Sequence, residues 1–139
     1  MATGVALTHR AEKALLNYML RNIVTSGFPP GTVYVGLFTA APDDQGGGTE
    51  VFGGSYARQS VSFAAPTDNG ASSGSQAASA AEIVFPAASA DWGTITAVGL
   101  FDAVSGGNLL MYGSLSAAQT VNAGSQFVIP AGSLTALLD

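Results

Sequence analysis

The chain has 139 residues, of which 47% are hydrophobic and only 9% are charged, against roughly 25% charged residues in an average soluble domain. Its formal net charge is −5 and it contains no cysteine, which excludes disulfides, thiolate nucleophiles and cysteine zinc sites. No apolar run reaches the roughly 18 residues of a membrane span, and no basic stripe offers a contact for nucleic acid. So few charges favour a protein that is packed against neighbours in an assembly, and they argue against catalysis.

The length predicts a single domain over residues 1–139. Residues 1–30 form an N-terminal arm and helix, and residues 31–139 form the remaining body. The first part carries a charge of +2, from Arg10, Lys13 and Arg21 against Glu12, whereas Arg58 against eight acids gives the body −7. A basic arm on an acidic body is therefore expected, and the arm has no secretory signal pattern.

Residues 8–25 predict one amphipathic helix with Thr8 as its N-cap, ended by Gly27 and the two prolines that follow. At about 100° per residue, one arc holds the apolar side chains Leu15, Leu16, Met19, Leu20 and Ile23. The opposite side holds Arg10, Lys13, Asn17 and Arg21. We expect the apolar stripe to pack on the chain's own sheet, with docking on a partner protein as the alternative.

From residue 32 onward, alternating apolar residues separated by Gly, Pro, Asn and Asp predict short antiparallel strands. The expected strands are 32–40, 56–63, 82–85, 94–102, 108–115, 126–129 and 133–138, with shorter ones at 50–52 and 120–122. The fold class is therefore mainly β: a two-layer antiparallel β-sandwich, jelly-roll-like, with one N-terminal amphipathic α-helix.

Two further features stand out along the chain. The sequence VGLFTA at 35–40 is echoed by VGLFDA at 98–103, which suggests equivalent strands across the core, with Gly36 and Gly99 allowing close approach; chance similarity is the alternative. Residues 69–81 contain neither a charge nor a bulky apolar side chain, so this segment is expected to be a low-complexity loop.

The sequence contains only weak signals of catalytic chemistry. Residues 70–74 match the G-x-S-x-G pattern of serine hydrolases, but they lie in low-complexity sequence and the chain's one histidine is His9. The acidic residues have no calcium-loop spacing and are expected in turns. Trp92 with three tyrosines could form a sugar-binding platform, although packing beside the core is the favoured interpretation. No catalytic residue, cofactor site or metal site is predicted.

Arg58 is the one basic residue after Arg21, and we expect it to meet an acid within the fold or across a subunit boundary. The predicted assembly contacts are Arg10, Lys13, Arg21, Arg58 and Trp92.

The order of several short motifs resembles a family of small virion proteins of tailed bacteriophages, often labelled tail fibre or head-decoration proteins. The motifs are ALLN at 14–17, VYVGLFTA at 33–40 with Pro42, EV at 50–51, GGSYARQ at 53–59, VFP at 84–86, WGTI at 92–95, GNLL at 107–110, YG at 112–113 and LD at 138–139. The resemblance implies a non-enzymatic structural protein present in many copies, as an oligomer around a symmetry axis. The loop at 69–81 is long for that family.

The favoured function is a capsid decoration (cement) protein that binds the major capsid protein and copies of itself, as a homotrimer, in a virion assembled in the bacterial cytoplasm. The alternatives are a tail, baseplate or fibre-attachment protein and, from a different class, a carbohydrate-binding sandwich.

Overall fold

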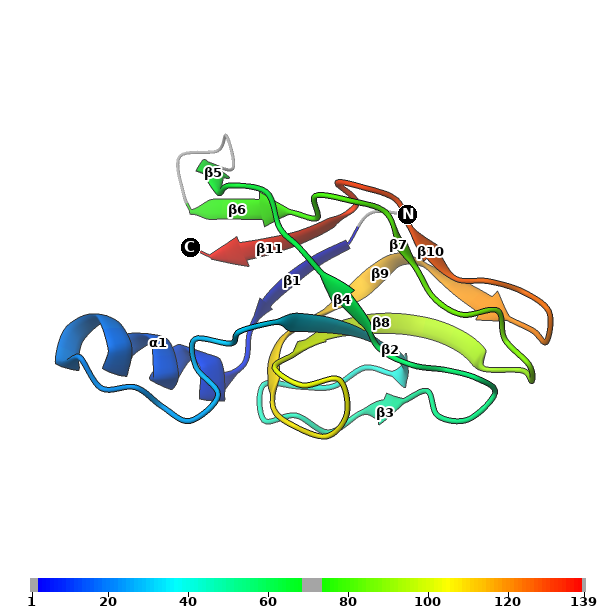
Figure 1. Ribbon diagram of the computed structural model, residues 1–139, viewed down its shortest axis with the longest axis horizontal. Helices are drawn as coiled ribbons and strands as arrows, with labels where there is room; N and C mark the ends of the chain where they lie inside the picture. The colour runs from blue at the N-terminus through cyan, green and yellow to red at the C-terminus, as the bar shows by residue number, and fades with distance from the viewer. Residues whose placement is uncertain (1–2, 69–73, 139) are drawn as a thin grey trace.

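The computed structural model describes residues 3–68 and 74–138, and in this part of the chain the fold is mainly β with one helix (Figure 1). The elements in chain order are β1 (Thr3–Leu7), α1 (His9–Arg21), β2 (Val33–Ala40), β3 (Thr49–Glu50), β4 (Gln59–Val61), β5 (Thr67–Asp68), β6 (Ser75–Ala78), β7 (Ile83–Val84), β8 (Gly93–Phe101), β9 (Leu109–Val121), β10 (Val128–Ile129) and β11 (Leu134–Leu138). The predicted β-rich class with an N-terminal helix is confirmed.

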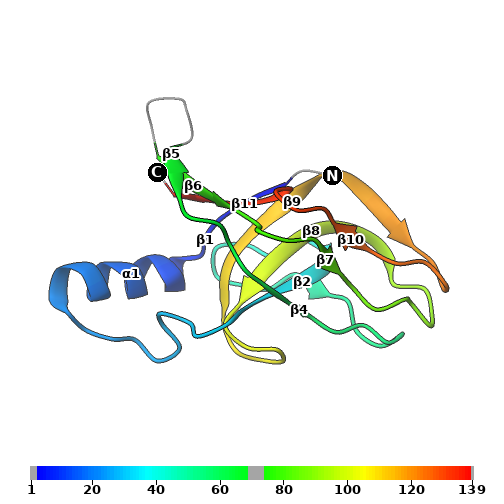
Figure 2. The same cartoon turned by 45° about the horizontal axis from the view of Figure 1, so that its top comes forward.

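The strands form a nine-stranded sheet in the order β3-β2-β8-β9-β1-β11-β6-β5, with β4 also paired to β2, and a two-stranded sheet of β7 and β10. Every described pair is antiparallel except β1 with β11, so the sheet is mixed. Strands β8 and β9 are strongly curved (Figure 2).

The core lies between the curved sheet and the β7–β10 pair, which is the arrangement of a sandwich. Val35, Leu37 and Val98 from the large sheet and Ile83 and Ile129 from the small one belong to a single buried cluster. Two aromatic residues that flank the small sheet, Phe85 and Phe127, are fully buried, with ring centroids 5.8 Å apart in an edge-to-face arrangement.

The two similar sequences at 35–40 and 98–103 lie on β2 and β8, which are neighbours in the sheet rather than strands on opposite sides of the core. Gly36 is directly opposite Gly99 in their antiparallel register. A Cβ atom at Gly99 would lie 2.8 Å from a ring carbon of Phe38 and 2.6 Å from a methyl carbon of Leu109. The absence of a side chain there makes room for the rings that pack on this face.

Two parts of the predicted layout are wrong. The N-terminal arm contains β1, which pairs with β9 and β11 in the interior of the sheet. The segment 69–81 is not a loop throughout, because Ser75–Ala78 form β6 and pair with β11. Small alanine and serine side chains suit a strand whose backbone hydrogen bonds, rather than its side chains, provide the pairing. Residues 69–73 lie outside the described residues.

Helix α1 begins at the predicted N-cap but ends earlier than predicted. Thr8 has an extended backbone, and its hydroxyl accepts a hydrogen bond from the Ala11 N–H, so it is an N-cap. The helix ends at Arg21, four residues before the predicted residue 25, and Asn22 follows it in the left-handed conformation.

The face that α1 buries is not the predicted one. Ala11 and Ala14 are the buried residues of the helix, whereas Leu16, Met19 and Leu20 are 55%, 66% and 74% exposed. Alanine allows the helix to approach β1 and β9 closely, and Thr8, which also donates to the Leu109 carbonyl, fixes the direction in which the helix leaves the sheet. Most of the apolar stripe therefore does not pack on the chain's own sheet.

A test of this architecture is the close approach of β9 to β1. A Cβ atom at Gly113 would overlap the carbonyl oxygen of Gly4. Because backbone atoms cannot move aside as a flexible side chain does, we expect Gly113→Ala to lower the free energy of unfolding by at least about 2 kcal/mol, measured by urea denaturation. Gly31→Ala is the control, since a Cβ there meets nothing within 4 Å. Equal stability of the two variants would contradict the register of β1.

Candidate functional site

Exposed apolar side chains are concentrated at one end of the molecule. Of the eleven large hydrophobic residues that are exposed in the described part of the chain, eight belong to this end. They are Leu16, Tyr18, Met19, Leu20, Ile23, Val24, Leu137 and Leu138. Figures 1 and 2 both place α1 beyond the edge of the sheet, at the same end as the C-terminal end of β11. We call this set of residues the apolar end, and exposed patches of this kind mark interaction surfaces.

A groove lined almost entirely by apolar groups runs between the helix and the strands β6 and β11. Its volume is about 300 Å³. Leu15 and Phe28 form one wall, and Ala77, Ala136 and Leu137 lie among the residues of the other. Leu15 of the predicted stripe thus lines the groove, while Leu16, Met19 and Leu20 continue the apolar surface outward.

The three basic residues predicted as assembly contacts on the helix are all exposed: Arg10, Lys13 and Arg21. Arg10 donates to the Ser26 carbonyl at 3.0 Å, and Arg21 donates to the Asn17 side chain at 3.1 Å. These bonds are at the surface, where they leave the charges available to a partner. The outer side of α1 is therefore an apolar row beside a basic edge.

Arg58 has a different position from the one predicted for an assembly contact. Its guanidinium donates twice to the Glu50 carboxylate, both at 2.8 Å, and its side chain is 8% exposed. It also donates to the carbonyls of Ala103 and Gly106, and its Cζ lies 3.4 Å from the centroid of the Phe101 ring. The acid that Arg58 was expected to meet is within its own chain, and the guanidinium is used internally.

Tyr56 completes this network. Its hydroxyl donates to Glu50 at 2.7 Å and accepts from the Leu37 N–H at 2.9 Å. Burial, and then the hydrogen bond to the Glu50 carboxylate, raise the pKa of Tyr56 far above its usual value, so the hydroxyl remains protonated. A Cβ at Gly36 would lie 2.7 Å from a Glu50 oxygen, which explains why glycine occupies the strand opposite the carboxylate.

Trp92 is also an internal residue rather than a surface contact. It is 6% exposed, its indole N–H donates to the Gly54 carbonyl at 2.9 Å, and its ring packs edge-on against Tyr56. Tyr112 donates to Asp44 at 2.6 Å. The rings considered for a sugar-binding platform are thus not gathered on one exposed face.

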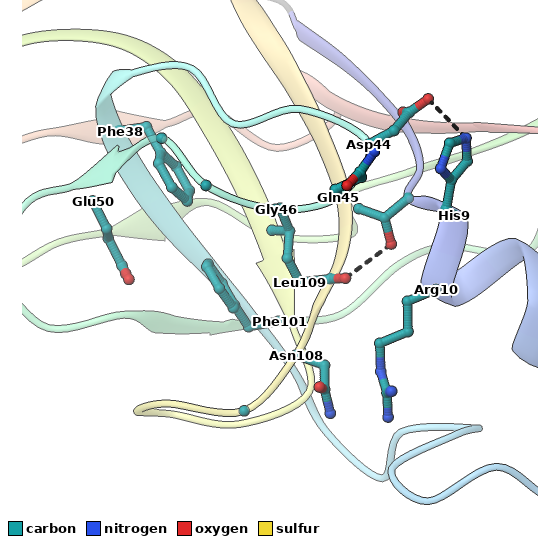
Figure 3. A pocket seen from close by; sticks show the side chains of 14 residues that line it. His9, Arg10, Phe38, Asp44, Gln45, Gly46, Glu50, Phe101, Asn108 and Leu109 are labelled. Atoms are coloured by element: carbon teal, nitrogen blue, oxygen red, sulfur yellow. Dashed lines mark hydrogen bonds and ion pairs between the residues drawn. The ribbon is translucent and has the colours of Figure 1, made fainter.

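A pocket of about 450 Å³ with a mixed polar and apolar lining lies at the start of α1 (Figure 3). His9 and Asp44 meet there at 3.3 Å, and each side chain is about half exposed. The hydrogen bond to Asp44, followed by burial, raises the pKa of Tyr112. Asn108, on the other wall, donates its backbone N–H to Asp102 at 2.7 Å. The pocket's polar groups hold loops together, and His9 pairs with an acid rather than with a serine.

Most of the G-x-S-x-G pattern, residues 70–73, lies outside the described residues. Within residues 3–68 and 74–138, no group of three or more His, Asp or Glu is arranged to hold a metal ion. The described helix is too short and too polar to cross a bilayer.

Comparison with protein families finds a match over nearly the whole chain. A family model described as "Podophage GP4 fiber I protein gp80" matches residues 6–136. No curated protein matches the sequence.

The Arg58 network leads to a stability prediction. Arg58→Met leaves the Glu50 carboxylate without its partner, so we expect the free energy of unfolding to fall by about 3 kcal/mol. Adding Glu50→Leu removes the unpaired charge and should recover part of that loss. Arg21→Met, at an exposed site, should stay within about 0.5 kcal/mol of the parent. Chemical denaturation measures all three, and a loss at Arg58 as small as that at Arg21 would contradict the internal role.

Proposed function

Because the chain belongs to the podophage GP4 fiber I protein family, it is a small structural protein of the virion of a tailed phage, and we propose that it serves there as a non-enzymatic building block of the fibre. The match spans residues 6–136, which include α1 and nearly all of the sheet. The fibre or tail role, predicted above as the alternative to capsid decoration, fits the family description.

The observation that carries the proposal is the uncovered outer side of α1. Leu16, Met19 and Leu20 are more than half exposed, at positions separated by three and four residues, which is the spacing of anchors on a helix that docks against another surface. Burying such side chains stabilises a contact by roughly 25 cal/mol per Å² of apolar area. A protein that works alone in water gains nothing from that arrangement, whereas a virion component does.

The scarcity of charge supports the same role. Many modest contacts, repeated over many copies, give strong overall attachment without one strong site. The predicted homotrimer stays part of the proposal, and so does the absence of enzymatic activity.

A capsid-decoration role remains the second candidate, because the basic edge formed by Arg10, Lys13 and Arg21 would suit an acidic lattice of the major capsid protein. For this role the three side chains, rather than the apolar row, are the decisive contacts.

The location can be tested directly on intact particles. Antibody raised against the purified protein, labelled with gold and imaged by electron microscopy, should decorate the fibres of the phage. Purified virions should contain the protein in many copies by quantitative mass spectrometry. Label spread over the head would support decoration instead, and absence from purified virions would contradict both candidates.

The decoration role makes a separate prediction. Reversing the basic edge with Arg10→Glu, Lys13→Glu and Arg21→Glu should abolish binding to expanded empty heads if these side chains contact the capsid, as measured by co-sedimentation. Arg10→Gln, Lys13→Gln and Arg21→Gln provide the matched control, which removes charge without adding repulsion. Failure of the parent protein to bind heads would exclude this role and leave the fibre role in place.

A further inference from the structure

We propose that the apolar outer side of α1 packs over the groove between α1 and the strands β6 and β11 of a second copy of this chain, so that the helix of each copy contacts the groove of the next. The inference rests on the proposed function and names the partner that the apolar end takes.

The outer side of α1 and the groove are both apolar. Leu16, Met19 and Leu20 form a row within an arc of about 100° on the helix, opposite the buried Ala11 and Ala14. The groove is lined by apolar atoms almost throughout, including those of Met111 and Leu137. An amphipathic helix laid in an apolar groove is a recurring mode of recognition, with contacts at every third or fourth residue.

Helix α1 cannot fill the groove of its own chain. Leu15 and Phe28 of the same chain already form one wall. The outer row lies on the side of α1 that faces away from the buried alanines. The side chains of a second helix placed over the groove would therefore lie between the first helix and the part of the sheet formed by β6 and β11.

The helix segment and the rest of the chain also carry opposite net charges. The segment that contains α1 carries +2, while the remainder of the chain carries −7. Asp68 in β5 pairs in the sheet with Ser75, which lines the groove, and is exposed. A neighbour's α1 thus brings Lys13 and Arg21 toward an acidic body. Direct pairing of two α1 helices would instead place like charges together, which is unfavourable.

The resulting contact joins different surfaces on the two copies, because the helix of one meets the groove of the next. Such heterologous contacts close into rings when the rotation between copies allows it. A ring of three is the state that agrees with the predicted homotrimer, and the experiment below measures the number of copies.

The cysteine-free sequence makes a crosslinking test straightforward. Leu20→Cys and Gln76→Cys are prepared as separate single-cysteine proteins, mixed and oxidised, so that any Leu20→Cys to Gln76→Cys bond is between chains. We expect a mixed disulfide dimer in high yield. Asn17→Cys, on the polar side of the same helix, is the matched control and should give little product with Gln76→Cys.

The oligomeric state gives the second readout. Light scattering over a concentration series should show the parent protein as an oligomer. The triple variant Leu16→Gln, Met19→Gln and Leu20→Gln should be a monomer with unchanged circular dichroism, since these side chains make no core contacts. Asn17→Gln should remain an oligomer.

Three outcomes would overturn the inference. They are a parent protein that is monomeric at every concentration, Leu20→Cys that crosslinks with itself and not with Gln76→Cys, and a triple variant that keeps the parent's oligomeric state. If the antibody still labels the fibres in any of these cases, the proposed function stands and α1 docks on a different virion protein. Absence from the virion would remove the proposed function itself.

Discussion

Strand β1 fixes where α1 can go, and the exposed surface of the molecule follows from that constraint. The strand lies between β9 and β11, and Thr3 donates to the Ser114 carbonyl at 2.6 Å. One residue later than its end, Thr8 both caps the helix and donates to β9. With no linker to let it turn back, α1 contacts the body through two alanines and extends beyond the sheet. Its larger apolar side chains are left for another molecule.

The few charges of the chain fall into two groups, those that pair inside the fold and those that stay exposed at the surface. Glu50 lies on β3, at the end of the strand order far from β6 and β11, and it pairs with Arg58 inside the fold. The Arg58 guanidinium also donates to two carbonyls of the loop after β8. Asp102 closes the same loop through Asn108. The cations that remain at the surface are on α1, beside the apolar row. Internal pairing thus leaves the exposed charges divided between a basic helix and an acidic body.

Local signals in the sequence predict the positions of many strands and of the helix start, but they do not predict which distant segments pair with one another. The alternation in 32–40 and 94–102 places β2 and β8, and Thr8 identifies the start of the helix. Periodicity shows that α1 has two faces, but it cannot show that small alanines, rather than leucines, face the body, because that depends on how closely β9 approaches. Strand β6 was missed because its alanines and serines carry no strand propensity and are ordered by pairing with β11. The sequence predicts that Arg58 meets an acid, but only the three-dimensional structure identifies that acid as Glu50.

The central claim is that the outer side of α1 is open in the isolated chain and covered in the particle. Hydroxyl-radical footprinting of Met19, which is 66% exposed, tests it most directly, with a methionine-containing peptide added to both samples as the reference for radical dose. The account predicts rapid oxidation of Met19 in the purified protein diluted to its monomeric state and strong protection of the same residue in intact virions. Equal oxidation in the two states would contradict it.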